Sequence, residues 1–224
     1  KALKFYNQAL PLAQEVEDKT LQATSLTNIG GVYSDLGDKQ QALKLLNQAL
    51  NLDREVGYKN GEATILNNIA SVYNDLGSNE QALKFYEQAL LLSIKVEDKS
   101  QQAITLNNIG IVYKDLGDYQ QALEFYNQAL PLHQEVEDKS GEATTLSNIG
   151  GIYDSLGDKQ RALTFYNRAL PLREEVGDKS GQASTLNNIG YVYYYLKDKQ
   201  RALKLYNQAL PLREEVGDKL AQAI

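Results

Sequence analysis

The chain has 224 residues, and its 42% hydrophobic and 23% charged residues are proportions typical of an ordinary folded protein. It carries 23 Lys and Arg against 29 Asp and Glu, and the net charge of −6 opposes binding to the phosphate backbone of nucleic acid. The absence of Cys excludes disulfides and thiolate metal sites, and no window approaches the run of about 18 apolar residues that a membrane span requires.

The chain contains no Met, begins at Lys1 in the middle of a pattern and shows no signal peptide. We therefore expect a fragment of a longer protein, with the cytoplasm as its default location.

The sequence repeats itself with a period of 40 residues. Residues 141–180 and 181–220 differ at only 12 of 40 positions. The register is marked, without any insertion, by Asn28, Asn68, Asn108, Asn148 and Asn188, by Tyr33, Tyr73, Tyr113, Tyr153 and Tyr193, and by Ala42, Ala82, Ala122, Ala162 and Ala202. A unit of this size cannot bury its apolar face alone, so it stacks on its neighbours. The period predicts one continuous repeat domain over residues 1–224 that functions through its surface.

Each unit is expected to be a pair of helices. In chain order the elements are a lone second helix at 1–18, five full units at 19–58, 59–98, 99–138, 139–178 and 179–218, and the start of a sixth unit at 219–224. The prediction is an all-α chain of 11 helices plus a C-terminal stub.

The third unit shows the pattern within a repeat. Its first helix, roughly 100–116, is indicated by apolar or small residues spaced by three and four, namely Ala103, Leu106, Ile109, Gly110, Tyr113 and Leu116. Gly117 is suited to the positive φ of a helix end, and Asp118 is suited to capping the next helix. The second helix is indicated by Ala122, Leu123, Tyr126, Ala129, Leu130 and Leu132.

Some positions predict local departures from this pattern. Small residues at one position of the first helix predict a close approach of the paired helix: Gly30, Ala70, Gly110, Gly150 and Gly190. Prolines at one interior position of the second helix predict a kink without a break: Pro11, Pro131, Pro171 and Pro211. Lys197 replaces the turn glycine found at Gly157, which predicts a turn of different shape.

The tetratricopeptide repeat is the known pattern that this unit resembles. The match is carried by Leu106-x2-Ile109-Gly110-x2-Tyr113, Gly117-Asp118-Tyr119 and Ala122-x3-Tyr126-x2-Ala129. HEAT repeats and propeller blades share the period, but the Gly, Ala and Tyr spacing and the absence of Trp favour the tetratricopeptide repeat. The 40-residue unit is similar to the longer units of kinesin light chain, the Leu-Gly-Asn spindle-orientation adaptor and bacterial signalling-associated arrays. The resemblance implies an α-solenoid, a right-handed superhelix of helix-turn-helix hairpins whose first helices form a groove for an extended peptide.

Asparagines are the candidate ligand contacts on the first helices. By resemblance, the stripe containing Asn28, Asn68, Asn108, Asn148 and Asn188 lines the concave wall, and Asn67, Asn107 and Asn187 add a second polar row. A carboxamide can pair with both groups of one peptide unit, so such a row could hold a backbone without reading its sequence. The alternative, that these side chains satisfy polar groups between repeats, stays open.

Charge and aromatic residues refine the expected ligand. We count Lys114 as the only cation on the first helices, against the acids Asp35, Glu62, Asp75, Asp115, Glu142 and Asp154, so a neutral or basic peptide is expected. In the last full unit Tyr191, Tyr194 and Tyr195 are candidate binding residues, because aromatic side chains are enriched in binding hot spots. The alternative for them is packing against a further helix or a neighbouring molecule.

No catalytic residue, cofactor site or metal site is predicted. His133 is the only imidazole, without Cys or a second His nearby in the sequence, and we expect it at the surface. The leading hypothesis is therefore a non-enzymatic scaffold for protein–protein interaction, part of a larger signalling or regulatory protein, with no nucleic-acid or membrane partner. The alternative is head-to-tail self-association through apolar residues at the chain ends, namely Leu3, Phe5, Leu10, Leu220 and Ile224.

Overall fold

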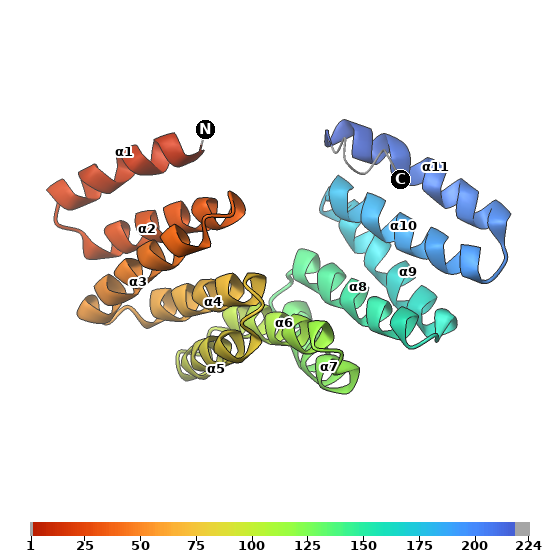
Figure 1. Cartoon of the computed structure of the whole chain (residues 1–224), viewed down its shortest axis with the longest axis horizontal. Helices are drawn as coiled ribbons and strands as arrows, with labels where there is room; N and C mark the ends of the chain where they lie inside the picture. The colour runs from red at the N-terminus through yellow and green to blue at the C-terminus, as the bar shows by residue number, and fades with distance from the viewer. Residues whose placement is uncertain (1, 218–224) are drawn as a thin grey trace. The chain divides into compact units, whose positions relative to one another are not determined.

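The computed structural model describes residues 2–217, without the side chains of residues 2–4 and 7. The regular elements in this part of the chain are all helical (Figure 1): α1 (Ala2–Glu15), α2 (Lys19–Asp35), α3 (Lys39–Val56), α4 (Lys59–Asp75), α5 (Asn79–Lys95), α6 (Lys99–Asp115), α7 (Tyr119–Glu135), α8 (Lys139–Ser155), α9 (Lys159–Glu175), α10 (Lys179–Tyr195) and α11 (Lys199–Glu215). The prediction of an all-α chain with 11 helices is confirmed over these residues. The expected C-terminal stub at 219–224 lies outside them.

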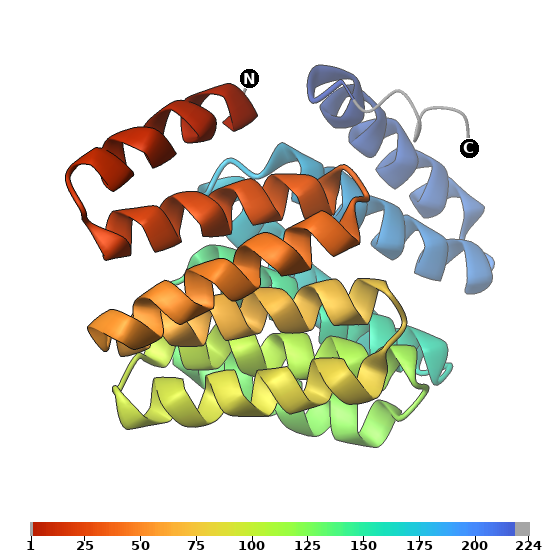
Figure 2. The same cartoon turned by 60° about the vertical axis from the view of Figure 1, so that its left-hand side comes forward.

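The chain divides into two compact units, residues 1–112 and 113–224, with the boundary inside α6. In the first unit α2 pairs with α3 and α4 pairs with α5, while α3 also packs on α4 (Figure 2). In the second unit α8 pairs with α9 and α10 pairs with α11, while α9 packs on α10. Within each unit the repeats are therefore helical hairpins packed on one another, and one continuous domain over 1–224 remains a prediction.

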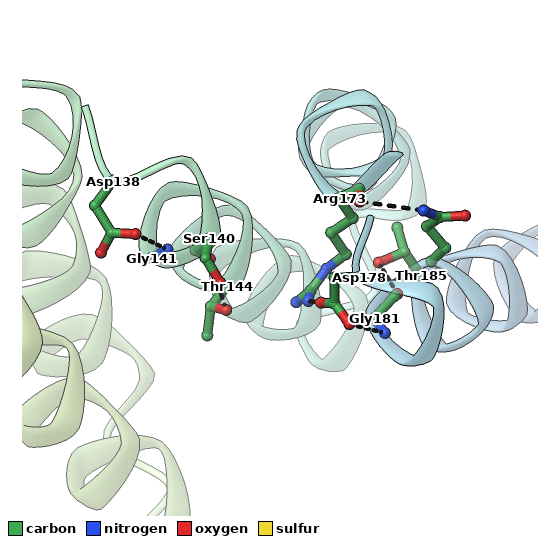
Figure 3. Close-up of polar contacts among 9 residues, drawn as sticks. Asp138, Ser140, Gly141, Thr144, Arg173, Asp178, Gly181 and Thr185 are labelled. Carbon is green, nitrogen blue, oxygen red and sulfur yellow. Dashed lines mark hydrogen bonds and ion pairs between the residues drawn. The ribbon is translucent and has the colours of Figure 1, made fainter. Parts of the chain in front are cut away.

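Aspartates set the starts of most helices. In each case a side-chain oxygen accepts a hydrogen bond from the backbone N–H three residues later, as at Asp18, Asp38, Asp98, Asp118, Asp138, Asp158, Asp178 and Asp198. Figure 3 shows this contact from Asp138 to Gly141 and from Asp178 to Gly181. Such a cap satisfies an N–H that has no partner within its helix and contributes about 1 kcal/mol. The predicted capping role of Asp118 is confirmed.

Each turn contains a residue in the left-handed conformation. Gly117 takes it with φ of 79°, as predicted, and Lys197 takes it with φ of 68°. The Lys197 N–H donates to the carbonyl of Tyr194 at 3.0 Å, and Gly157 N–H donates to Asp154 at the same distance. The expectation that Lys197 changes the turn is therefore wrong. The hydrogen bonds of the helix end hold the backbone, although a left-handed non-glycine residue costs about 1 to 2 kcal/mol.

Small residues allow the two helices of a hairpin to approach. A Cβ at Gly150 would lie 2.8 Å from the ring of Tyr166, and one at Gly190 would lie 2.8 Å from the ring of Tyr206. The predicted close approach is confirmed at these positions. Alanines of the second helix are completely buried at the matching contact, as at Ala42, Ala82, Ala122 and Ala162.

Leu116 does not belong to the apolar face of its helix. Its side chain is 53% exposed, because α6 ends at Asp115 and the next residue points away from the helix pair. The leucines at the same position of the other repeats are also exposed, namely Leu36, Leu76, Leu156 and Leu196. Including Leu116 among the regularly spaced apolar residues of the first helix was therefore wrong.

The prolines lie inside continuous helices. Pro11, Pro131, Pro171 and Pro211 are interior residues of α1, α7, α9 and α11. The prediction that they do not break the helix is confirmed, and the associated kink remains a prediction.

Candidate binding surface on the first helices

The main row of asparagines follows the first helix of each repeat. Asn28 and Asn188 are exposed, and Asn68, Asn108 and Asn148 are half-buried. In the first unit the Asn108 side-chain amide donates to Oδ1 of Asn67 at 3.1 Å, which joins α6 to α4. The row therefore takes part in repeat–repeat contacts while keeping side-chain surface, since a carboxamide has more than one donor and acceptor.

The second row of asparagines lies deeper. Asn67 and Asn107 are only 6% and 7% exposed, and Oδ1 of Asn67 also accepts from the Thr105 hydroxyl at 3.2 Å. Consecutive residues of a helix point about 100° apart, so the second row turns into the packing between repeats. Asn67 and Asn107 are therefore removed from the candidate ligand surface.

Asn187, the third member of that row, is half-buried beside α11. With its carboxamide oxygen facing Arg213, Asn187 accepts from Nε at 3.0 Å and from Nη2 at 2.6 Å. This asparagine thus contacts the second helix of its own hairpin, and its predicted role in ligand binding stays a prediction.

The three tyrosines of α10 form an exposed aromatic patch. Tyr191, Tyr194 and Tyr195 are 45%, 51% and 53% exposed. The Tyr191 and Tyr195 ring centroids are 4.6 Å apart, and Tyr194 meets Tyr195 edge-on at 5.8 Å. A hydrogen bond with Tyr195 raises the pKa of the Tyr191 hydroxyl. The patch also touches the preceding repeat, because Lys159 Nζ lies 5.8 Å from the Tyr191 centroid and 5.2 Å from the Tyr195 centroid.

The acidic side chains are not all on one open wall. Glu62 is buried and accepts from Arg54 Nε at 2.8 Å and from Lys59 Nζ at 2.7 Å. Glu142 accepts from the Gln134 side chain at 2.7 Å. Both glutamates lie in the first turn of their helices and face the preceding second helix, so placing them on the wall was wrong.

Two of the aspartates are partnered by lysines. Asp75 pairs with Lys39, and Oδ1 of Asp154 lies 2.6 Å from Lys159 Nζ. Lys114 is also not the only cation of the first helices, which begin at Lys19, Lys59, Lys99, Lys139 and Lys179. The negative charge of this surface is therefore smaller than the sequence count suggests.

His133 is buried, contrary to the expected surface position. It is 2% exposed, and its Nδ1 lies 2.9 Å from Oδ2 of Asp138. The end of α7 faces the start of α8, and Gly141 leaves space for the imidazole there, since a Cβ at Gly141 would lie 2.2 Å from the ring. Figure 3 shows the equivalent group in the next repeat, where Arg173 pairs with Asp178 beside Gly181.

Side chains at this junction are matched in size. A large residue near the end of a second helix faces Gly in the next first helix, and a small residue faces a large one. The contacting pairs are Asp53 with Gly61, His133 with Gly141 and Arg173 with Gly181, and the equivalent positions in the repeat between them hold Ser93 and Gln101. This matching was missed in the sequence, although the presence of Gly eight residues after His133 and Arg173 is its visible signal.

Asp53 is the exception to the charge pairing at these junctions. Position 58 is Tyr, whereas His133 and Arg173 have an aspartate five residues later. Asp53 is 2% exposed, and among the residues that the structure describes its Oδ1 has no hydrogen-bond partner. Burial, followed by repulsion from Glu62, raises the pKa of Asp53 from 3.8 to about 6.

A small open pocket lies between α3, α4 and α5. Its volume is about 270 Å³, and it is lined by Arg54, Glu62, Leu66, Gln88, Leu91, Leu92 and Lys95. None of the predicted Asn or Tyr contacts lines it.

Searches for other kinds of site are negative within residues 2–217. In this part of the chain no group of three or more His, Asp or Glu side chains could hold a metal ion. No helix there has the length and apolar character needed to cross a membrane.

Comparisons with known proteins agree on the type of repeat. The family model described as Tetratricopeptide repeat matches residues 1–55, 61–135, 101–175 and 141–215. A search of curated proteins finds no match.

Solved structures share the fold. One is BtubC (BKLC) from P. vanneervenii, with a TM-score of 0.82 and 23% identity over 96% of this chain and 91% of that chain. Another is a Rap protein complexed with Competence and Sporulation Factor, with a TM-score of 0.73 and 17% identity over 96% and 70%. A third is NprR in complex with its cognate peptide NprX, with a TM-score of 0.69 and 21% identity over 92% and 61%. At these identities the likeness establishes the fold alone.

Proposed function

We propose a function for a chain that belongs to the tetratricopeptide repeat family: it is a scaffold that holds an extended peptide or partner segment along its first helices, within a larger signalling or regulatory protein. The observation that carries this proposal is the Asn with an exposed or half-buried side chain at one position of all five first helices. The solved complex of NprR with its cognate peptide NprX supports a peptide as the ligand.

The spacing of the asparagines suits an extended backbone. Packed helices are separated by about 8 to 10 Å, and an extended chain rises about 3.3 Å per residue. Within one unit, asparagines on neighbouring first helices, such as Asn148 and Asn188, would therefore meet about every third residue of a peptide. Because a carboxamide pairs with the backbone and not with a side chain, this row supplies affinity and register without sequence selectivity.

A neutral or basic peptide fits the charges of this surface better than an acidic one. Asp35 is exposed, and the side chain of Asp115 is 47% exposed, although Asp115 lies 3.4 Å from Lys114. Asp75 and Asp154 are partly neutralised by lysines. The preference should therefore be modest and should weaken with added salt.

A matched pair of asparagine substitutions tests the proposal. Peptides are selected from a random-sequence phage library on the whole chain, and the best one is measured by calorimetry. Replacing Asn148 and Asn188 by Ala removes two carboxamides from first helices, whereas Asn167→Ala removes one that is exposed on a second helix.

At about 0.5 to 1.5 kcal/mol for each hydrogen bond, the double substitution should weaken binding about tenfold. Asn167→Ala should leave the affinity unchanged. Equal losses in the two variants, or selection of no peptide at all, would contradict binding along the first helices.

Head-to-tail self-association is the second proposal. Leu203 on α11 is 61% exposed, whereas Leu163 at the same position of α9 is 5% exposed, because α10 packs against α9. Phe5 on α1 is 66% exposed, whereas Leu10 is half-buried and packs against the core of its own unit. Leu3, Leu220 and Ile224, also named for this contact, lie outside the described side chains.

Light scattering over a hundredfold range of concentration tests self-association. The mass should rise with concentration for the unaltered chain and stay monomeric for Leu203→Glu. A monomer at every concentration would contradict this second function and leave the peptide scaffold unaffected.

A further inference from the structure

A lysine of the protein itself shows which ligand chemistry the tyrosine patch accepts. Lys159, the first residue of α9, places its ammonium within about 6 Å of two ring centroids, the range in which a ring face attracts a cation. The same ammonium lies 2.6 Å from Oδ1 of Asp154 and donates to the Asp154 carbonyl at 3.1 Å. Two aromatic rings and a carboxylate therefore already hold one basic side chain.

Lys39, the corresponding lysine in residues 1–112, has no aromatic ring beneath its ammonium among the described side chains. Lys39 pairs with Asp75 and donates to the Ser34 hydroxyl at 2.9 Å. Asp75 occupies the position of Tyr195, and Ser71 occupies that of Tyr191. At Lys159, tyrosine rings thus stand where Asp75 faces Lys39. The lysine is kept, and the group that it faces on the next helix changes from a carboxylate to aromatic rings.

The rings keep room for a second cation. Tyr191, Tyr194 and Tyr195 each have about half of their surface exposed, although Lys159 contacts two of them. Tyr194 stands nearly perpendicular to Tyr195, with an interplanar angle of 80°. Lys159 therefore approaches from the preceding repeat and leaves ring surface open to solvent.

We propose that Tyr191, Tyr194 and Tyr195, with Asp154, receive a Lys or Arg side chain of the bound peptide, and that Lys159 competes with it for the same rings and carboxylate. This inference rests on the proposed peptide-binding function. Asn188, Tyr191 and Tyr195 are spaced by three and four residues along α10, so they share one face of the helix. A peptide whose backbone meets Asn188 would therefore bring a neighbouring side chain to the rings. For this reason we assign the cation to a peptide and not to a free ammonium compound.

Competition by Lys159 makes the proposal testable without knowing the natural peptide. The probe is Nα-acetyl-lysine methylamide, with Nα-acetyl-glutamine methylamide as the uncharged control. Binding is followed by NMR through the ring resonances of the three tyrosines. The variants are Lys159→Gln, which frees the rings and Asp154, and Lys39→Gln, which removes the equivalent lysine where no ring is present.

The lysine probe should bind Lys159→Gln about two- to fivefold more tightly than the unaltered chain, the range expected from one cation–ring contact. Lys39→Gln should not change the affinity. In the Lys159→Gln background, Tyr195→Phe should keep binding because the ring remains, and Tyr195→Leu should lose it. Ring resonances that stay unmoved by the lysine probe in Lys159→Gln, or that respond equally to the glutamine probe, would overturn the proposal.

Two further measurements distinguish a peptide side chain from a free cation, and the tyrosine site from the asparagine row. Asn188→Ala should weaken binding of the lysine probe, which carries amides, and should not affect tetramethylammonium. If tetramethylammonium binds as tightly as the lysine probe and Asn188→Ala affects neither, the site is one for free cations and the proposal is wrong. If the Asn148 and Asn188 double substitution does not weaken peptide binding but the lysine probe still shifts the tyrosine ring resonances in Lys159→Gln, only the proposal that the asparagines bind a peptide backbone is refuted.

Discussion

The fit between His133 and Gly141 at the α7–α8 junction can be measured by a double-mutant cycle. A Cβ at Gly141 would lie 2.2 Å from both Cε1 and Nδ1 of the imidazole and 2.3 Å from Oδ2 of Asp138, where carbon contacts normally lie about 3.5 to 4 Å apart, so the ring and the carboxylate that contacts it must move together. In Gly141→Ala the ring must move by more than about 1 Å to reach that separation. Such a shift disturbs the 2.9 Å contact between Nδ1 and Asp138.

Overpacking of this kind costs about 1 to 3 kcal/mol, and replacing a helical Gly by Ala returns up to about 1 kcal/mol. Gly141→Ala should therefore change the free energy of unfolding by anything from about 0 to a loss of about 3 kcal/mol, and its coupling to His133 is the more informative quantity. His133→Ser also destabilises the protein, because it leaves a cavity and removes the partner of Asp138. In the double variant the new methyl group occupies space that the ring has left, so the two losses should fall short of additivity by at least about 1 kcal/mol.

Urea unfolding followed by far-ultraviolet circular dichroism gives these energies. Midpoint and slope are compared together, because repeat arrays can lose cooperativity and a changed slope would reveal it. Gly151→Ala is the matched control, since a Cβ there meets only the Tyr166 hydroxyl at 3.6 Å, and it should stabilise the protein by up to about 1 kcal/mol. Strict additivity of Gly141→Ala and His133→Ser would refute the steric reasoning.

Three further predictions follow from the structure. Asp53→Ser should raise the free energy of unfolding at pH 7 by about 1 kcal/mol, because it removes a buried carboxylate that is charged at this pH. Because the pKa of Asp53 is raised in the folded protein, its protonation stabilises the fold fully below pH 3.8, and this stabilisation is lost as the pH rises through about 6. The difference in stability between the variant and the unaltered protein should therefore vanish near pH 3. The neighbouring charged residues Arg54, Lys59 and Glu62 are present in both proteins. Lys197→Gly should raise the urea midpoint and increase the free energy of unfolding by about 1 kcal/mol, because Gly adopts the left-handed conformation without strain. The reverse change, Gly157→Lys, should lower the midpoint. A midpoint unchanged by both substitutions would contradict the strain assigned to Lys197. Asp178→Ala should lower the stability measured by thermal unfolding by about 2 to 3 kcal/mol, since it removes a helix cap and the partner of half-buried Arg173. Asp198→Ala, at an exposed cap, should lower it by only about 1 kcal/mol. Equal losses would show that the ion pair with Arg173 adds nothing.

The helices and turns could be predicted from the sequence because their signals are local. The expected first helix at 100–116 is observed as Lys99–Asp115, since Asp98 and Gly117 mark its two ends. The resemblance to tetratricopeptide repeats is confirmed by the family match. Leu116 was misplaced because a spacing rule continues the helix beyond the residue at which it stops.

Contacts between repeats could not be predicted in the same way. The burial of His133 depends on Gly141, which lies in another helix, and nothing local to the imidazole reports it. Asn67 and Asn68 are adjacent and identical in type, so only the packing direction of α4 shows which of them is buried. The exposure of the tyrosine patch followed from its position on the helix, whereas its contact with Lys159 required the arrangement of α9 and α10.

The size matching at the repeat junctions bears on how such an array changes its length. Neighbouring units are similar enough in sequence that recombination between their coding segments would readily delete or duplicate one of them. A duplication of residues 99–138 would place His133 before a second copy of Gln101, where two large side chains would meet, and a deletion of the same residues would place Ser93 before Gly141, where two small residues would leave space. Only a deletion or duplication that keeps a large side chain opposite glycine, or a small one opposite a large one, should yield a stable protein of the new length. The side chains at the junctions therefore limit how many repeats the array can gain or lose.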